Sequence, residues 1–159
     1  MDAVTVTSNE SSGRAPTVAI AALGVLYTCA VLWVTLRPLP WATDGNQEPL
    51  GILSPRAWVG WSTWAAGSPL EVVANVAMFV PLGLVAGLLF RGAAGFIVPV
   101  ALTLAIELAQ IPLSDRISHP RDLVANATGA ALGVMIVVLV RRRRSPAPAR
   151  DRRRPGAGT

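Results

Sequence analysis

Long apolar segments alternate with short polar connections along most of this chain. A helix needs about 20 mainly apolar residues to cross a bilayer, and four segments approach or reach that length. We expect the spans at residues 17–36, 70–90, 94–111 and 122–140. The pattern therefore predicts an all-α polytopic membrane protein with four transmembrane helices.

Proline and capping residues indicate where these helices begin and end. Residues 37–40, Arg-Pro-Leu-Pro, stop the first span, because proline lacks a backbone N–H. Residues 68–71, Ser-Pro-Leu-Glu, have the pattern of a capping box with proline at the first helical position. Pro112 ends the third span and residues 119–120 precede the fourth, which places Asp122 in its first turn, where the helix dipole favours negative charge.

The connection between the first two spans, residues 37–69, is rich in tryptophan. Ser54-Pro55 resembles a helix start, and Trp58, Trp61 and Trp64 follow at three-residue spacing. Tryptophan prefers the headgroup level of a membrane, so we expect one short interfacial helix here. The alternative is a platform of aromatic rings that stack on a substrate. The two remaining tryptophans lie near the same face, at positions 33 and 41.

Composition supports the membrane assignment. Hydrophobic residues make up 52% of the 159 residues and charged residues 14%, whereas soluble domains carry about 25% charged residues. The net charge of +5 comes from 14 arginines against 9 acidic residues, and eight of those arginines follow residue 140. Arginines next to a span have a simple cause in membrane topology, so no nucleic-acid partner is expected. Cys29 is the only cysteine, which excludes an intramolecular disulfide.

The two ends differ from the middle of the chain. We expect residues 1–16 to be a disordered lead and residues 141–159 a disordered Arg/Pro-rich tail around a transmembrane domain at 17–140. A cleaved signal peptide is the competing interpretation of the first span, but the lead is not basic and no small-residue cleavage pattern follows. The four arginines at 141–144 predict a cytoplasmic C-terminus, and an even number of spans then places the N-terminus on the same side.

Polar side chains lie at similar depths near the outer ends of three spans. Asn75, Glu107 and Asn126 are each four or five residues from the outer end, which is about 6–8 Å at the helical rise. Gln110 and Asp122 share helix faces with Glu107 and Asn126. The connection between the third and fourth spans adds Arg116, His119 and Arg121. An ionisable residue within an apolar span is costly, so this cluster is the candidate functional site.

Two pairs of glycines predict close helix packing around the cluster. Gly83 and Gly87 in the second span, and Gly129 and Gly133 in the fourth, form small-xxx-small patterns. Such patterns allow helix backbones to approach closely.

The same positions carry a family resemblance. The pattern is N-x3-F-x-P-x-G from Asn75, then E-x2-Q-x5-R-x5-D-x3-N-x2-G-x3-G from Glu107 to Gly133. This pattern resembles the VanZ-like family of bacterial membrane proteins. The resemblance implies a multi-span protein of the bacterial cytoplasmic membrane with a role at the cell envelope. The family takes its name from a protein linked to teicoplanin resistance, and no cofactor or resident metal is implied.

The cluster admits several functions. As a binding site, Arg116 and Arg121 would grip an anionic head group of a membrane lipid or lipid-linked envelope component, with Asn75, Gln110 and Asn126 adding neutral hydrogen bonds. As an enzyme, Glu107 would be the general base and Asp122 the second carboxylate. That carboxylate pair, with His119, could instead hold a divalent cation.

A structural role is the third alternative, in which an ion-pair network of Glu107, Arg116 and Asp122 only fixes helix packing. His119 by itself is typical of a solvated loop residue. A transporter is disfavoured, because the strong polar groups all lie near one face. The sequence leaves open whether the protein is an enzyme and whether it forms homo-oligomers.

Overall fold

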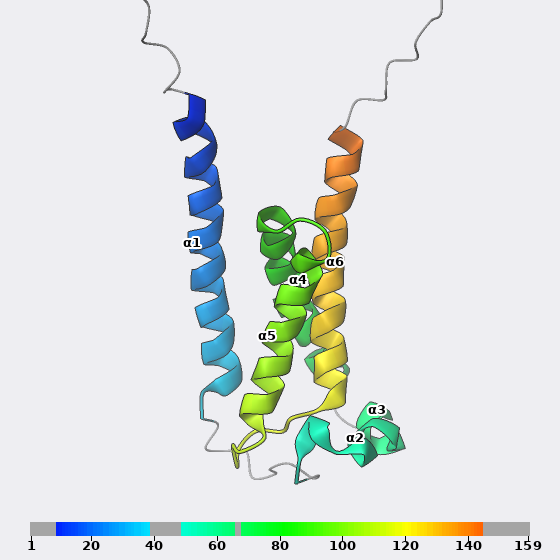
Figure 1. Ribbon diagram of the computed structural model, residues 1–159. Coiled ribbons are helices and arrows are strands. Elements are labelled where there is room, and N and C mark those ends of the chain that lie inside the picture. Colours follow the sequence, from blue (N-terminus) through cyan, green and yellow to red (C-terminus); the bar gives the residue numbers. More distant parts are fainter. Residues whose placement is uncertain (1–8, 39–48, 66–67, 145–159) are drawn as a thin grey trace, which may run out of the picture.

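The computed structural model describes residues 9–38, 49–65 and 68–144, and within these ranges it contains helices and no strand. Four long helices lie roughly along one axis (Figure 1). They are α1 (Asn9–Leu36), α4 (Pro69–Leu89), α5 (Ala94–Gln110) and α6 (Pro120–Arg144). The prediction of an all-helical chain is confirmed for the residues described.

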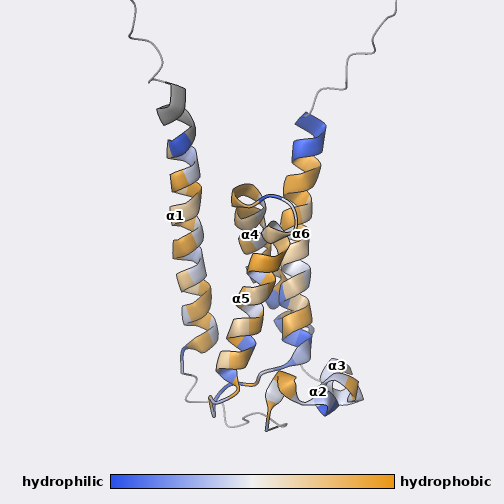
Figure 2. Cartoon of the chain, in the orientation of Figure 1, coloured by the Kyte–Doolittle hydropathy of each residue, from blue (hydrophilic) through white to orange (hydrophobic). Residues whose placement is uncertain are grey.

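Three of the long helices have the length and apolar character needed to cross a membrane. They are the Arg14–Leu36 part of α1, α4 and α6. The fourth, α5, is apolar but has only 17 residues. Figure 2 shows apolar residues along the helices and hydrophilic residues gathered near their ends. The chain is therefore a polytopic membrane protein with three full-length candidate spans and one shorter apolar helix.

Two helices extend further than the sequence pattern predicted. α1 begins at Asn9, within the lead that was expected to be disordered, and includes Pro16. α6 begins at Pro120 and continues through the four arginines to Arg144. Once a helix exists, each added residue gains a hydrogen bond without a new nucleation cost, and cations suit the C-terminal end of the dipole. The expectations for residues 1–8, 145–159 and Trp41 fall outside the described residues.

The tryptophan-rich connection forms three short elements instead of one helix. They are the 3₁₀ turn η1 (Gly51–Leu53), α2 (Pro55–Val59) and α3 (Trp61–Ala65). Gly60 has an extended ψ of 124° and separates α2 from α3, so Trp58 and Trp61 belong to different helices. The indole of Trp58 donates to the Ile52 carbonyl at 2.8 Å, which ties α2 back to η1. These elements lie at the end of the bundle opposite the ends of α1 and α6 nearest the chain termini (Figure 1).

The buried core joins three of the long helices. Phe79 of α4 and Ile106 of α5 are almost completely buried and pack with Val31 of α1. The Tyr27 hydroxyl of α1 donates to the Met78 carbonyl of α4 at 3.0 Å. α1 is thus attached to α4 and α5 on the side of the bundle away from α6.

Glycine allows α4 and α6 to pack backbone against backbone. A Cβ at Gly83 would clash with the Ala130 carbonyl, and one at Gly129 would clash with the Val76 carbonyl. At Gly133 it would lie 2.6 Å from the Leu84 nitrogen. Gly87 is less crowded, with Val137 side-chain atoms at 3.3 Å. This close contact brings the first turns of α4 and α6 together, where the polar cluster lies.

Candidate functional site

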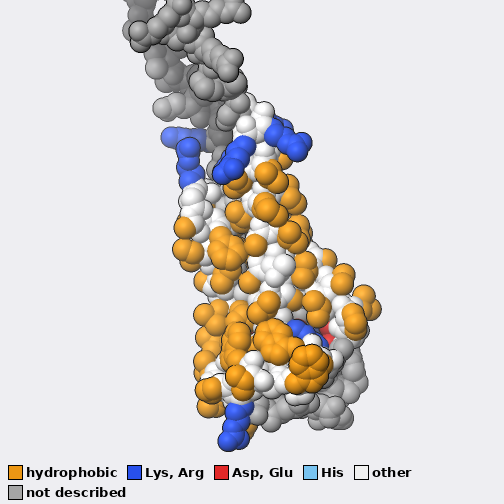
Figure 3. Space-filling view, turned by 90° about the vertical axis from the view of Figure 1, so that its right-hand side faces the viewer, with side chains coloured by type: hydrophobic (Ala, Val, Ile, Leu, Met, Phe, Trp, Pro, Cys, Tyr) orange, Lys and Arg blue, Asp and Glu red, His pale blue; other side chains and the backbone are white. Residues whose placement is uncertain are grey.

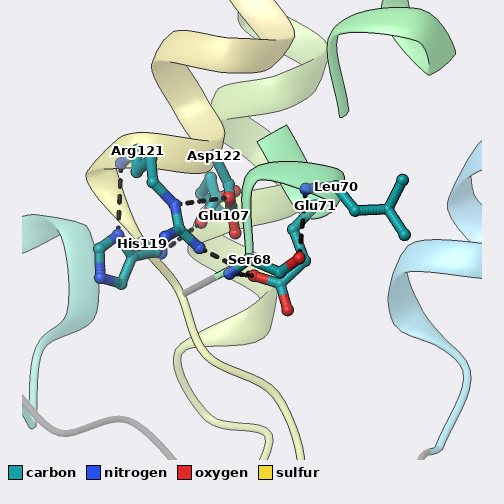
Figure 4. Close-up of polar contacts among 7 residues, drawn as sticks. All are labelled: Ser68, Leu70, Glu71, Glu107, His119, Arg121 and Asp122. Carbon is teal, nitrogen blue, oxygen red and sulfur yellow. Dashed lines mark hydrogen bonds and ion pairs between the residues drawn. The ribbon is translucent and has the colours of Figure 1, made fainter. Parts of the chain in front are cut away.

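The polar residues gather where α4 and α6 begin and α5 ends. The N-terminus of α4 is fixed by the predicted capping box: the Ser68 hydroxyl accepts from the Leu70 N–H at 3.2 Å, and Glu71 Oε2 accepts from the Ser68 N–H at 3.3 Å. Figure 4 shows Glu71, Glu107, His119, Arg121 and Asp122 close together at this end of the bundle. The elements that carry them are α4, α5, α6 and the 111–119 connection.

Glu107 is turned toward the connection that follows its own helix. Its side chain is 2% exposed, and Oε2 accepts a hydrogen bond from the His119 backbone N–H at 2.8 Å. The Ser118 hydroxyl donates a second hydrogen bond to the same carboxyl group. Ser118 Oγ also accepts from the Ile52 N–H at 3.4 Å, so η1 is attached to the same loop. Glu107 therefore anchors the 111–119 connection from inside the bundle.

Gln110 and Arg116 hold the end of α1. The amide of Gln110 donates to the Thr35 carbonyl at 3.0 Å. The guanidinium of Arg116 donates to the carbonyls of Val34 at 2.9 Å and Arg37 at 2.7 Å. The last carbonyls of a helix have no partner within that helix, so these two side chains complete the C-terminus of α1.

This arrangement changes the expected role of Arg116. The guanidinium serves backbone carbonyls of α1, and the arginine beside Asp122 is Arg121. The ion-pair network of Glu107, Arg116 and Asp122, which the structural alternative required, is therefore not formed as expected, and Arg121 forms ion pairs with Glu71 and Asp122 instead.

Arg121 lies between two carboxylates. Its Nη2 donates to Glu71 Oε2 at 3.0 Å, and its Nε lies 3.8 Å from Asp122 Oδ1 (Figure 4). The Arg121 side chain is 14% exposed, whereas that of Glu71 is 60% exposed. From α4, the Asn75 amide donates a hydrogen bond to the Asp122 carboxylate. The structure thus brings together Asn75, Arg121 and Asp122, as predicted, and adds Glu71.

Asn126 lies one helical turn deeper than Asp122. It is 3% exposed, and its Nδ2 donates to the hydroxyl of the fully buried Thr103 on α5 at 2.8 Å. Its Oδ1 is buried and accepts no hydrogen bond, and the same is true of Asp122 Oδ1. A buried acceptor without a donor is costly and marks a position where a ligand or water would be stabilised.

His119 is half-buried and not the solvated loop residue that was expected. Its Nδ1 accepts from the Arg121 backbone N–H at 3.4 Å. Burial lowers the pKa of His119 below the usual 6.5, and the smaller effects are those of Asp122 and Glu71, which raise it, and of Arg121, which lowers it. The imidazole is therefore neutral at pH 7 and adds no positive charge to the cluster. Among the described residues, no three His, Cys, Asp or Glu side chains come together in a way that could hold a metal ion.

Sequence reasoning missed three members of the cluster: Glu71, Thr103 and Ser118. A signal existed for two of them. Thr103 precedes Glu107 by four residues and so lies on the same face of α5. Glu71 was recognised as a capping residue, but its contact with Arg121 joins positions 50 residues apart in the chain. No local pattern distinguishes Ser118 from other loop serines.

The fold and the cluster together define a class: a helical polytopic membrane protein with a polar site where three helices meet at one end of the bundle. The family model described as VanZ/LLP1 matches residues 24–141. The chain therefore belongs to the VanZ/LLP1 family, as the motif from Asn75 to Gly133 had indicated. No curated protein matches the chain, and no solved structure does.

Proposed function

We propose that this chain is a cytoplasmic-membrane protein of the bacterial cell envelope that binds the polar head of a lipid or lipid-linked envelope component. The site would comprise Asn75, Arg121, Asp122 and Asn126, with Glu71 at its rim. The single observation that carries the proposal is the pair of buried acceptor oxygens, on Asp122 and Asn126, that accept no hydrogen bond. A site that served only to join helices would be expected to satisfy its own buried groups.

The orientation of the site supports a ligand from the outer leaflet. Arg14, Arg91 and the four arginines at 141–144 lie at or beyond the helix ends away from the cluster. Such a bias is typical of the cytoplasmic side, which would place the cluster outside and both termini inside. This topology requires α5 to be the fourth span. Its 17 residues correspond to roughly 26 Å, close to the thickness of the hydrocarbon core.

The structural role retains a specific observation in its favour. Glu107 accepts a hydrogen bond from the 111–119 loop, and Arg116 donates to a carbonyl at the end of α1. We therefore assign these two residues to stabilising the fold. The enzymatic alternative gains no such support, because the carboxyl group of Glu107 faces backbone and is 2% exposed. A general base must reach the proton that it removes.

Native mass spectrometry of the protein purified in mild detergent tests the proposal. We expect the wild type to retain a lipid that the double variant Arg121→Gln/Asp122→Asn loses. The matched control is Arg56→Gln, which removes an exposed arginine at the same end of the bundle and should retain the lipid. Equal lipid retention by wild type and double variant, with both folded by thermal melt, would refute the proposal.

A consequence for antibiotic susceptibility follows only if the envelope role is correct. The resemblance to a family named for teicoplanin resistance motivates the comparison. Deleting the gene and restoring either the wild type or the double variant would show whether teicoplanin susceptibility depends on the site. If the wild type and the double variant restore teicoplanin susceptibility equally, then the effect on susceptibility does not depend on lipid binding at the site.

A further inference from the structure

The charges of the site indicate which kind of head group it would take. Two carboxyl groups of the cluster, those of Glu71 and Asp122, contact Arg121, whereas the carboxyl group of Glu107 is bonded to the 111–119 loop. One guanidinium, that of Arg121, lies among them and contacts Glu71 and Asp122. His119 is neutral at pH 7 because burial lowers its pKa. The second arginine that could have favoured an anion, Arg116, is directed to the carbonyls of α1. The cluster therefore presents more negative than positive groups.

Two buried acceptors that accept no hydrogen bond point in the same direction, although Arg121 Nε lies 3.8 Å from one of them, Asp122 Oδ1. Asp122 Oδ1 and Asn126 Oδ1 are both buried, and Asn126 is 3% exposed. The two residues are four apart on α6, so they share a helix face. A head group that carries several N–H groups on one nitrogen has donors for both oxygens.

Apolar surface borders the cluster on the helices that form it. Leu70 and Val73 of α4 are 73% and 61% exposed, and Val124 of α6 is 44% exposed. Exposed tryptophans of α2 and α3 lie at the same end of the bundle. Figure 3 shows hydrophobic side chains along the whole of one face, and in its lower part some of them lie beside a small blue and red patch. A ligand that joined a polar head to acyl chains would find partners for both parts here.

We propose that the ligand of this site is a phospholipid with a primary ammonium head group, whose nitrogen donates to Asp122 Oδ1 and Asn126 Oδ1 while its phosphate lies near Arg121. This inference rests on the proposed lipid-binding function and specifies its chemistry. Glu71, exposed at the rim, adds negative charge that attracts the ammonium group from the headgroup layer. A primary ammonium has three N–H groups and can donate to both acceptors, whereas a trimethylated ammonium has no N–H group to donate.

The test uses the full chain in micelles that contain equal amounts of three synthetic lipids with identical acyl chains: phosphatidylethanolamine, phosphatidylcholine and phosphatidylglycerol. Native mass spectrometry reads the retained lipid. We expect the wild type to retain phosphatidylethanolamine over each of the other lipids by roughly tenfold, the effect of one charge-assisted hydrogen bond. Asp122→Asn should remove most of this preference, and Arg56→Gln should keep it.

Glu71→Gln provides a second variant with little risk to folding, because glutamine also serves in a capping box. It should weaken the preference over phosphatidylglycerol and leave the preference over phosphatidylcholine in place. Equal retention of phosphatidylcholine and phosphatidylethanolamine would overturn the inference, since hydrogen-bond donation would then be irrelevant. Preferred phosphatidylglycerol that is lost in Arg121→Gln would overturn it too, but would leave the proposed lipid-binding function standing. If no lipid is retained in a way that depends on the cluster, both fail together.

Discussion

Replacing Gly133 with alanine should separate α4 from α6. The new Cβ would lie 2.6 Å from the Leu84 nitrogen and 2.8 Å from the Gly83 carbonyl carbon, and would clash with the Val80 carbonyl oxygen. All three are backbone atoms, so no side-chain rotation can relieve the contact. Ordinary van der Waals contact begins at 3.4 Å, so relief at Leu84 alone requires a displacement of about 0.8 Å.

The expected loss of stability follows from the packing that is lost between α4 and α6. A gap of 0.5–1 Å forfeits roughly a quarter to a half of each dispersion contact, and overpacked sites cost about 1–3 kcal/mol. Alanine also gains close to 1 kcal/mol of helix propensity over glycine, which partly hides the clash. Gly87→Ala is the matched control, because it shares the propensity gain but meets Val137 side-chain atoms at 3.3 Å. We expect Gly133→Ala to be less stable than Gly87→Ala by about 1–3 kcal/mol.

Unfolding in mixed micelles, titrated with a denaturing detergent and followed by circular dichroism, measures this difference. The same variants should be tested for lipid retention, because a shift of α6 would also move Asp122 and Asn126. Equal stability of the two variants, or a more stable Gly133→Ala protein, would refute the close α4–α6 contact on which the site depends.

Two further predictions concern the connection around the site. Arg116→Gln removes the guanidinium donors to the carbonyls of Val34 and Arg37. It should lower the free energy of unfolding by about 1–2 kcal/mol, since hydrogen bonds from charged groups are the stronger kind. Detergent titration measures this loss against the control Arg56→Gln, and an unchanged free energy of unfolding would argue against capping of α1. Because the pKa of His119 is lowered in the folded protein, its neutral form contributes stability that is present above about pH 6.5 and is lost as the pH falls through the lower folded value. Melting temperatures from pH 7.5 to 5 should therefore fall more steeply for the wild type than for His119→Gln, and parallel curves would contradict this linkage.

Much of the architecture follows from local sequence. The apolar lengths, the capping box at Ser68 and the arginines at 141–144 each depend on residues close together in the chain, and membrane-spanning helices satisfy their backbone internally. For this reason α4 and α5 begin and end within a residue of their predicted bounds. The helix ends next to polar segments were less well predicted, because extension of an existing helix needs no apolar signal.

The sequence by itself indicated where the polar cluster lies and named several of its members, since polar groups at one depth in neighbouring helices must find one another in an apolar surrounding. Only the tertiary structure decided how these residues are paired. Arg116 and Arg121 look alike in sequence. The packing of α1 against α5 places Arg116 beside backbone carbonyls at the end of α1, whereas the close α4–α6 contact places Arg121 beside Glu71 and Asp122. Such pairing depends on how helices approach one another, and between α4 and α6 this approach is set by glycine contacts that join distant parts of the chain.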